Sequence, residues 1–249
     1  MSGAITLTRR AFLVRSSAAG AGLLLGFHLP ARNKLAAAPQ ATGDGQAVAV
    51  NAWIEIHPDD SGLIRVARSE MGQGIFTALP MLVAEELDCD WSKVRAEYAS
   101  ANENQRRDNV FKSMSTGGSR SVRGSQDYLR TAGAVARELL VTAAADRWGV
   151  PVDECVGANS VITHTSSGRT LGYGAVAGAA AKLQAPEAVF LKEPDEWRLL
   201  GTPVKRLDVP DKISGKPVFG ADVVVPGMLH AAIRACPVFG GRLKQHDAA

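Results

Sequence analysis

Cysteine is scarce in this chain of 249 residues, which contains only Cys89, Cys155 and Cys236. The three residues are far apart and form no Cys-x-x-Cys pair and no cluster with histidine, so the sequence offers neither a zinc nor an iron–sulfur site. We expect buried free thiols, and a disulfide between two of them stays open. The five histidines are equally isolated, and their spacing predicts no metal site.

Aromatic residues and long apolar runs are also few. Aromatic side chains make up 6% of the chain and do not alternate with basic residues, which argues against nucleic-acid binding. The longest apolar stretch, residues 18–27, has ten residues, whereas a membrane-spanning helix needs about 20. The length is still sufficient for one or two domains with a hydrophobic core.

Acidic residues are absent from residues 1–38, which hold five of the 28 basic residues. The net charge of +3 therefore comes from this leader, and the rest of the chain is slightly acidic. Arg9-Arg10, the apolar run and three alanines before Pro39 are the parts of a twin-arginine export signal. We expect residues 1–38 to direct the folded protein to the periplasm. Two alternatives stay open: an amphipathic N-terminal helix, and an uncleaved signal that associates the protein with a membrane.

Strand and helix patterns alternate after a polar linker at residues 39–46, which predicts an α+β fold with a mixed sheet. Strands are expected at 52–56, 63–66, 94–99, 161–164 and 169–171, and helices at 75–87, 121–148 and 173–183. Residues 47–185 would form the first domain, and the proline-rich residues 186–205 a connector.

Strand patterns return in the last part of the chain. They are expected at 218–220, 222–225 and 229–233. Because residues 244–249 contain no large apolar side chain, we interpret residues 206–249 as an incomplete second domain.

The first of two glycine-rich loops, Ser69-Glu70-Met71-Gly72-Gln73-Gly74, lies between an expected strand and an expected helix. Gly72 and Gly74 would let a ligand approach the backbone, while the Gln73 amide offers a donor and an acceptor. Unpaired N–H groups at the helix start would point the same way. An ordinary glycine turn with a solvated glutamine is the alternative.

The second loop, Ser115-Thr116-Gly117-Gly118-Ser119-Arg120-Ser121, precedes the long helix. Small residues with hydroxyl groups at a helix N-terminus suit phosphate, although the missing Gly-Lys-Ser/Thr ending excludes a P-loop. The alternative is an ordinary N-cap loop, with Arg120 and Arg123 as solvated charges. Together the two loops fit a ligand with a polar ring system and a phosphate-bearing tail.

Four stretches carry a family resemblance: Arg68–Gly74, Leu79–Leu87, Gly117–Ser125 and Val238–Gly241. On these stretches the chain resembles the N-terminal part of the molybdopterin-binding large subunit of the xanthine dehydrogenase/aldehyde oxidase family. The isoquinoline 1-oxidoreductase β-subunit group is the most similar branch. The resemblance implies a molybdopterin cytosine dinucleotide cofactor with molybdenum, and hydroxylation of N-heterocycles or aldehydes with water as oxygen donor.

The resemblance also implies roles for particular residues. Gly72, Gln73 and Gly74 would lie against the pterin, with Gln73 close to the dithiolene. Gly118, Ser119 and Ser121 would cradle the pterin or its phosphates, and residues 206–249 would begin an α/β hammerhead domain. The implied partners are a [2Fe–2S] small subunit, a cytochrome c subunit and the C-terminal portion of the large subunit.

No catalytic residue is expected in this sequence. The family's catalytic glutamate lies near the C-terminus of a subunit roughly three times as long, as large multidomain enzymes are. Glu70 is instead predicted to be a structural hydrogen-bonding or surface residue. We expect the chain to supply part of a molybdopterin site without a complete active site.

A non-catalytic periplasmic binding or adaptor module with the same fold is the alternative function. Independent folding of residues 45–249 would favour the module, whereas aggregation would indicate that further domains cover its apolar strands.

Overall fold

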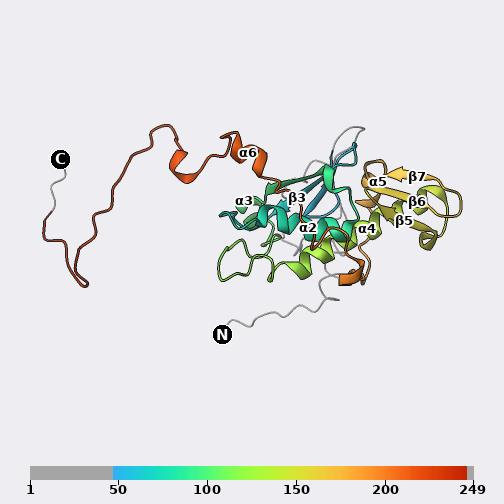
Figure 1. Ribbon diagram of the computed structural model, residues 1–249, viewed down its shortest axis with the longest axis horizontal. Helices are drawn as coiled ribbons and strands as arrows, with labels where there is room; N and C mark the ends of the chain where they lie inside the picture. The colour runs from blue at the N-terminus through green and yellow to red at the C-terminus, as the bar shows by residue number, and fades with distance from the viewer. Residues whose placement is uncertain (1–46, 246–249) are drawn as a thin grey trace. The chain divides into compact units, whose positions relative to one another are not determined.

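The computed structural model describes residues 47–245, and Figure 1 shows the path of the chain. Contacts within the chain divide it into two compact units, one ending at Val209 and one beginning at Pro210. Helices and strands alternate through the first unit, which confirms the predicted α+β fold. No helix among the described residues is both long and apolar enough to cross a membrane.

The first unit contains a four-stranded mixed sheet, sheet A, with the order β1-β2-β3-β4. Its strands are β1 (Val48–Ala49), β2 (Ile54–Ile56), β3 (Gly62–Val66) and β4 (Val94–Tyr98). The predicted hairpin of β2 and β3 is confirmed, with Ile54 opposite Ile64. β4 pairs with β3 in parallel, so both strands end at one edge of the sheet, where Val66 lies opposite Tyr98.

Helices α2 (Ile75–Leu87) and α4 (Gln126–Trp148) pack against each other and against sheet A. The bounds of α2 are those that the apolar spacing predicts. Gly133 lies in the contact between the helices, where a Cβ atom would come within 2.5 Å of the carbonyl oxygen of Val83. The small residues of α4 therefore allow the two helix backbones to approach closely.

Helix α4 begins later than predicted, because residues 121–125 form turns instead of its first turn. Gly124 lies within these turns, and glycine is a weak helix former. A short helix, α3 (Ala101–Arg106), was not expected from the sequence. It is capped by Ser100, whose hydroxyl oxygen accepts from the N–H group of Glu103.

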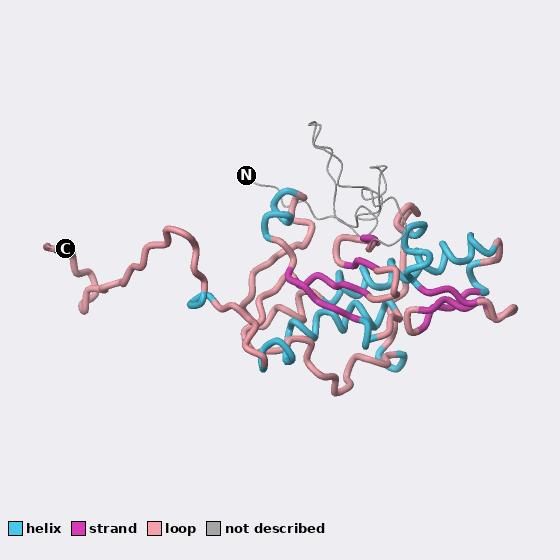
Figure 2. Tube along the Cα trace, turned by 90° about the horizontal axis from the view of Figure 1, so that it is seen from above, coloured by secondary structure: helices cyan, strands magenta, loops and turns pink. Residues whose placement is uncertain are grey.

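A second, antiparallel sheet, sheet B, adjoins the C-terminal part of α4 and appears as a separate group of strands in Figure 2. It contains β5 (Cys155–Ala158), β6 (Val161–His164) and β7 (Thr170–Gly172), followed by α5 (Tyr173–Ala180). The hairpin of β6 and β7 confirms the prediction, whereas β5 was missed. The buried Tyr173 hydroxyl donates to the carbonyl oxygen of Leu87 at 2.8 Å and so links α5 to the end of α2.

The connector, residues 186–205, is irregular as predicted, but it is packed onto α2. Its Lys192 ammonium group lies 2.6 Å from a carboxylate oxygen of Asp88 and 3.2 Å from one of Glu85. The same Glu85 side chain, only 3% exposed, accepts from the N–H groups of Leu199 and Leu200 at 2.7 and 2.9 Å. A buried carboxylate thus fixes the connector on the first unit.

The second unit differs from the expectation, because its described residues contain no strand. Helix α6 (Val209–Ile213) begins at the boundary, and local turns follow it. Strands are stable only when their backbone groups pair with neighbouring strands, and none of the described residues after 209 supplies such a partner. Apolar side chains of the predicted strands are consequently exposed, among them Val224, Leu229 and Ile233.

Candidate cofactor-binding site

The first glycine loop, residues 69–74, connects β3 to α2. Gly72 and Gly74 adopt φ angles of 103° and 87°, which residues other than glycine rarely adopt. A Cβ atom added at either residue would meet nothing within 4 Å, so the backbone, not internal packing, requires glycine here. The loop therefore exposes a stretch of backbone that a ligand can approach closely.

Glu70 occupies the N-terminal end of α2. One oxygen of its carboxylate accepts from the N–H groups of Gly72 and Gly74 at 2.7 and 2.9 Å, and the other accepts from Phe76 at 3.0 Å. These bonds confirm that Glu70 is a structural hydrogen-bonding residue. They also correct one expectation: the N–H groups of Gly74 and Phe76, predicted to be unpaired at this helix start, donate to the Glu70 carboxylate.

The environment of Glu70 keeps it ionised. Burial alone would raise the pKa of Glu70, but the three backbone N–H groups and the nearby Arg206 guanidinium outweigh burial, and the pKa is lowered from its usual value. The carboxylate is therefore an anion within the loop at neutral pH. A second anion at the same helix start would be repelled.

The Gln73 side chain is engaged with its own loop. Its amide oxygen accepts from the N–H group of Met71, and its amide nitrogen donates to the carbonyl oxygen of Ser69 at 3.0 Å. The side chain is exposed, so a ligand that replaces these two local bonds can reach it. The role of Gln73 beside the dithiolene stays a prediction.

The second glycine loop, residues 115–121, offers donors that the first loop does not. Gly118 and Ser119 have φ angles of 59° and 53°, and both residues are exposed. Within residues 47–245, the hydroxyl and backbone N–H groups of Ser119 and Ser121 make no hydrogen bond. Because α4 begins only at Gln126, these groups form a turn ahead of the helix, and the predicted contribution of the helix end is smaller than expected.

Hydrogen bonds join the two loops at the edge where β3 and β4 end. The N–H group of Ser69 donates to the Thr116 hydroxyl at 2.8 Å. The Arg68 guanidinium donates to the Ser113 hydroxyl at 3.2 Å and to the carbonyl oxygen of Ser115. The structure thus brings the two predicted loops together. The sequence alone predicted no role for Arg68 or Thr116, which make this contact.

Positive charge beside these loops lacks acidic partners. Arg68 is only 7% exposed, and its Nε has no hydrogen-bond partner. Arg120 and Arg123 are exposed, and Arg123 donates to the carbonyl oxygen of Gly118 at 3.2 Å. In the described part of the chain, no acidic side chain pairs with any of the three arginines. A buried guanidinium without a counter-charge is costly, so this donor set fits an anionic, oxygen-rich group such as a phosphate-bearing cofactor.

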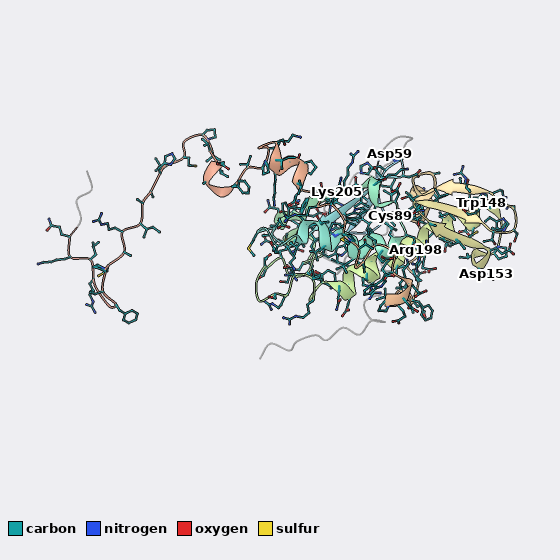
Figure 3. All side chains as sticks on the ribbon, viewed as in Figure 1. Asp59, Cys89, Trp148, Asp153, Arg198 and Lys205 are labelled. Carbon is teal, nitrogen blue, oxygen red and sulfur yellow. The ribbon has the colours of Figure 1, made fainter. Side chains whose placement is uncertain are left out.

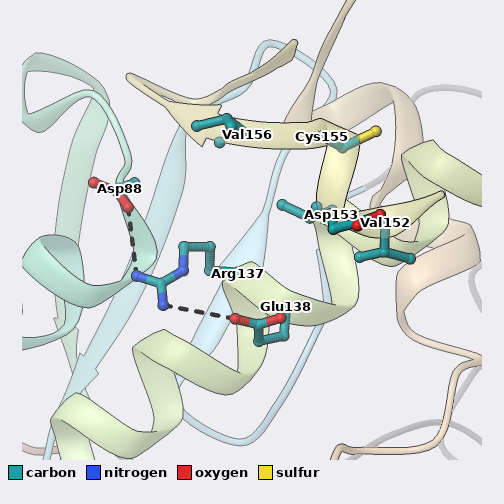
Figure 4. A pocket seen from close by; sticks show the side chains of 9 residues that line it. Asp88, Arg137, Glu138, Val152, Asp153, Cys155 and Val156 are labelled. Atoms are coloured by element: carbon teal, nitrogen blue, oxygen red, sulfur yellow. Dashed lines mark hydrogen bonds and ion pairs between the residues drawn. The ribbon is translucent and has the colours of Figure 1, made fainter. Parts of the chain in front are cut away.

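A cavity of the first unit lies away from the two glycine loops. It has a volume of about 500 Å³ and lies between α4 and β5, as Figure 4 shows. Arg137 projects into it, 3.4 Å from Asp88 and 3.7 Å from Glu138. None of the predicted site residues lines this cavity, which separates it from the glycine loops.

The one buried histidine among the described residues has side-chain partners. His164 is 5% exposed, with Nε2 2.8 Å from Glu154 and Nδ1 2.6 Å from the Ser167 hydroxyl. No group of three or more His, Cys, Asp or Glu side chains within residues 47–245 is placed to hold a metal ion.

Comparison with known proteins also indicates a site for a phosphate-bearing cofactor. The family model of the molybdopterin cofactor-binding domain matches residues 15–223. The chain therefore belongs to the molybdopterin cofactor-binding domain family, the cofactor domain of xanthine dehydrogenase/aldehyde oxidase-type oxidoreductases.

Two relatives match almost the whole chain. It is 33% identical to the isoquinoline 1-oxidoreductase subunit beta of Brevundimonas diminuta, over 95% of this chain and 34% of the relative. It is 35% identical to a membrane-bound aldehyde dehydrogenase (pyrroloquinoline-quinone) of Gluconacetobacter polyoxogenes, over 97% of this chain and 31% of the relative. The chain thus spans about a third of the length of these curated relatives.

Among solved structures, the quinoline 2-oxidoreductase of Pseudomonas putida 86 matches with a TM-score of 0.38 and 18% identity, over 51% of this chain and 15% of the other. A similarity at this level is too low to transfer details of the fold.

Proposed function

We propose that this chain forms the first part of the large subunit of a molybdenum hydroxylase that oxidises N-heterocycles or aldehydes. The observation that carries the proposal is the joined pair of glycine loops with its unpaired arginines, in a chain of the molybdopterin cofactor-binding family. When bound, the cofactor supplies two-electron oxidation of a carbon centre, with water as the source of oxygen. The catalytic base would come from the C-terminal portion of the subunit.

The chain's own residues bind and orient the cofactor. The turn at residues 118–121 donates N–H and hydroxyl groups, and Arg68, Arg120 and Arg123 supply positive charge. Residues 72–74 present uncharged backbone and the Gln73 amide, which suits the pterin. We propose the cytosine dinucleotide as the form of the cofactor.

Molybdenum and nucleotide analysis of the natural holoenzyme tests this function. We expect about one molybdenum per large subunit, because the cofactor is held by several charge-assisted hydrogen bonds. We also expect CMP on acid hydrolysis, because the proposed form of the cofactor is the cytosine dinucleotide. Replacing Arg120 in the second loop and Arg123 just after it, Arg120→Gln with Arg123→Gln, should lower the retained molybdenum about tenfold. The control, Arg95→Gln with Lys182→Gln, removes the same charge away from the loops and should retain it. A folded holoenzyme without molybdenum would rule out the function.

We also propose a location and partners. The isoquinoline 1-oxidoreductase relative is named as a subunit, which supports an assembly, and we propose an electron-accepting [2Fe–2S] subunit and a cytochrome c subunit as its other members. The paired arginines Arg9 and Arg10, outside the described residues, support export by the twin-arginine route with the cofactor already inserted. Replacing both with lysine should leave the protein in the cytoplasmic fraction, and periplasmic recovery of that variant would contradict the route. No observation favours the adaptor module.

A further inference from the structure

Three residues that follow the connector, Arg206–Asp208, return to the first glycine loop. The Nη1 group of Arg206 donates to the carbonyl oxygen of Gly72 at 3.1 Å, and its Nη2 group lies 3.2 Å from a carboxylate oxygen of Glu70. The backbone N–H group of Leu207 donates to the buried Thr77 hydroxyl at 2.9 Å. These contacts join segments that are more than 125 residues apart in the sequence.

The Arg206 guanidinium is held in a fixed orientation. Its Nε and Nη2 groups donate to the two carboxylate oxygens of Asp208 at 2.9 and 2.7 Å. This bidentate pairing directs the remaining Nη1 group at the loop. Arg206 therefore contacts both the carboxylate that shapes the loop and the carbonyl group of Gly72.

We propose that Arg206 is a positioning residue for the cofactor loop: by fixing Glu70 and Gly72, it makes the conformation of residues 70–74 depend on the docking of residues 206–208. Residues 206–208 belong to the first unit, so this coupling lies within that unit. Cofactor binding and docking of residues 206–208 then favour each other, because such coupling is reciprocal. The inference rests on the proposed function for its cofactor part and on the contacts alone for its loop part.

A purely stabilising role predicts a different result. The Arg206 side chain is 33% exposed, and the 4% exposed Glu70 carboxylate keeps its three backbone N–H partners without Arg206, so the ion pair contributes little to global stability. Its loss should therefore leave the unfolding transition nearly unchanged while loosening residues 69–76. Local hydrogen exchange separates the two roles.

The test compares Arg206→Lys and Arg206→Gln in the natural holoenzyme. Lysine keeps the charge without the bidentate geometry, so both variants should lose the fixed orientation. We expect the amides of residues 69–76 to exchange about tenfold faster, with exchange in α4 unchanged. Molybdenum retained after dialysis should fall in both variants.

The control is Arg107→Gln, which removes a similar, partly exposed ion pair with Glu103 that does not touch the loop. Unchanged exchange at residues 69–76 in both Arg206 variants would overturn the inference. If the wild-type holoenzyme contains no molybdenum, the proposed function fails, but the exchange measurement still decides whether Arg206 positions the loop. Faster exchange throughout the chain would show a general stabilising role and would also overturn the inference.

Discussion

At the scale of single residues, buried carboxylates stabilise the fold by accepting hydrogen bonds from backbone N–H groups. Glu70 and Glu85 are both carboxylates surrounded by backbone N–H groups, and each also contacts a distant segment of the chain, Glu70 through Arg206 and Glu85 through the connector. The sequence marked Glu70 because glycines surround it, but it gave no sign of Glu85. Apart from the Lys192 ammonium group, the partners of Glu85 are backbone N–H groups, which every residue type except proline carries, and they lie more than 110 residues away.

Replacing Glu85 with glutamine should weaken the fold. The variant loses the charge-assisted bonds to residues 198–200 and Lys192, and we expect the free energy of unfolding to fall by about 1–3 kcal/mol. Urea unfolding followed by circular dichroism measures this change. Glu187→Gln, an exposed glutamate in the same connector, is the control and should have no effect. Equal stability of the two variants would show that Glu85 does not fix the connector.

The same residue predicts the sign of a pH dependence. Burial would raise the pKa of Glu85, but the N–H groups of residues 198–200 and the Lys192 ammonium group lower it from its usual value. Glu85 therefore stabilises the folded state fully above the pKa of the unfolded chain, about 4.3. This contribution is lost as pH falls through the lower folded value. Stability curves between pH 7 and pH 3 should fall less steeply for Glu85→Gln than for the wild type.

The three thiols should differ in reactivity. Burial raises the pKa of Cys89 to about 12 and also raises the pKa of Cys155, whereas Cys236 is exposed. Cys89, which is labelled in Figure 3, is partly buried and lies two residues after the end of α2. Since the thiolate is the reactive form, iodoacetamide at pH 7.5 should modify Cys236 first, at about the rate of a free peptide cysteine. Peptide mass spectrometry over time measures the order, and early modification of Cys89 would contradict it.

At the scale of elements, apolar spacing predicts those helices and hairpins whose partners are close in sequence. The bounds of α2 follow from its apolar repeat, and the hairpin of β2 and β3 from the turn residues between them. β5 was missed because its four residues, Cys155–Ala158, include a glycine and follow a short 3-10 turn, which hides the alternating pattern.

Side-chain partners from other elements were harder to foresee. The two glycine loops meet through hydrogen bonds from Arg68 and Ser69 to residues 45 and 47 positions further along the chain, a contact that neither loop sequence encodes alone. The strands expected between residues 218 and 233 fail for the related reason that a strand needs a partner. The sequence thus located both loops, but it revealed neither the hydrogen bonds that join them nor the role of Arg68.

The space around two helix glycines, one in α4 and one in α5, predicts opposite effects for their replacement by alanine. At Gly133 a methyl group would clash with the carbonyl oxygen of Val83, and we expect a loss of about 2–4 kcal/mol in the free energy of unfolding. At Gly178 in α5 a Cβ atom would meet nothing within 4 Å, so alanine should raise stability by about 0.5–1 kcal/mol. Thermal or urea unfolding of both variants measures the pair. Tolerance of alanine at Gly133 would show that the helices can separate at little cost.

At the scale of the whole molecule, the two units differ in how their apolar side chains are covered. The first unit buries a continuous core that contains Trp53, Phe111, Leu129 and Leu140, and its two sheets are linked through α4. In the second unit, apolar side chains such as Phe239, Ile233 and Leu229 are exposed. Exposed apolar surface is a common feature of regions that take part in protein contacts.

Limited proteolysis should divide the chain at the boundary between the units. Lys216, Arg234 and Arg242 are exposed in segments held only by local turns, so trypsin should cut there first. We expect a resistant fragment that contains residues 47–209, identified by intact mass. Partner subunits that cover the second unit should slow these cuts, and early cleavage within α2 or α4 would contradict the assignment of the core.

The carboxylate of Glu70 has one more consequence, which concerns the direction in which an elongated ligand can lie. A negative charge that belongs to the chain already fills the start of α2, while the turn at residues 118–121 leaves its donors and two exposed arginines open to solvent. A molecule with one charged and one neutral end therefore meets a site with matching polarity. We expect its neutral end at residues 72–74 and its charged end at residues 118–123, because the reversed orientation would set two negative charges against each other.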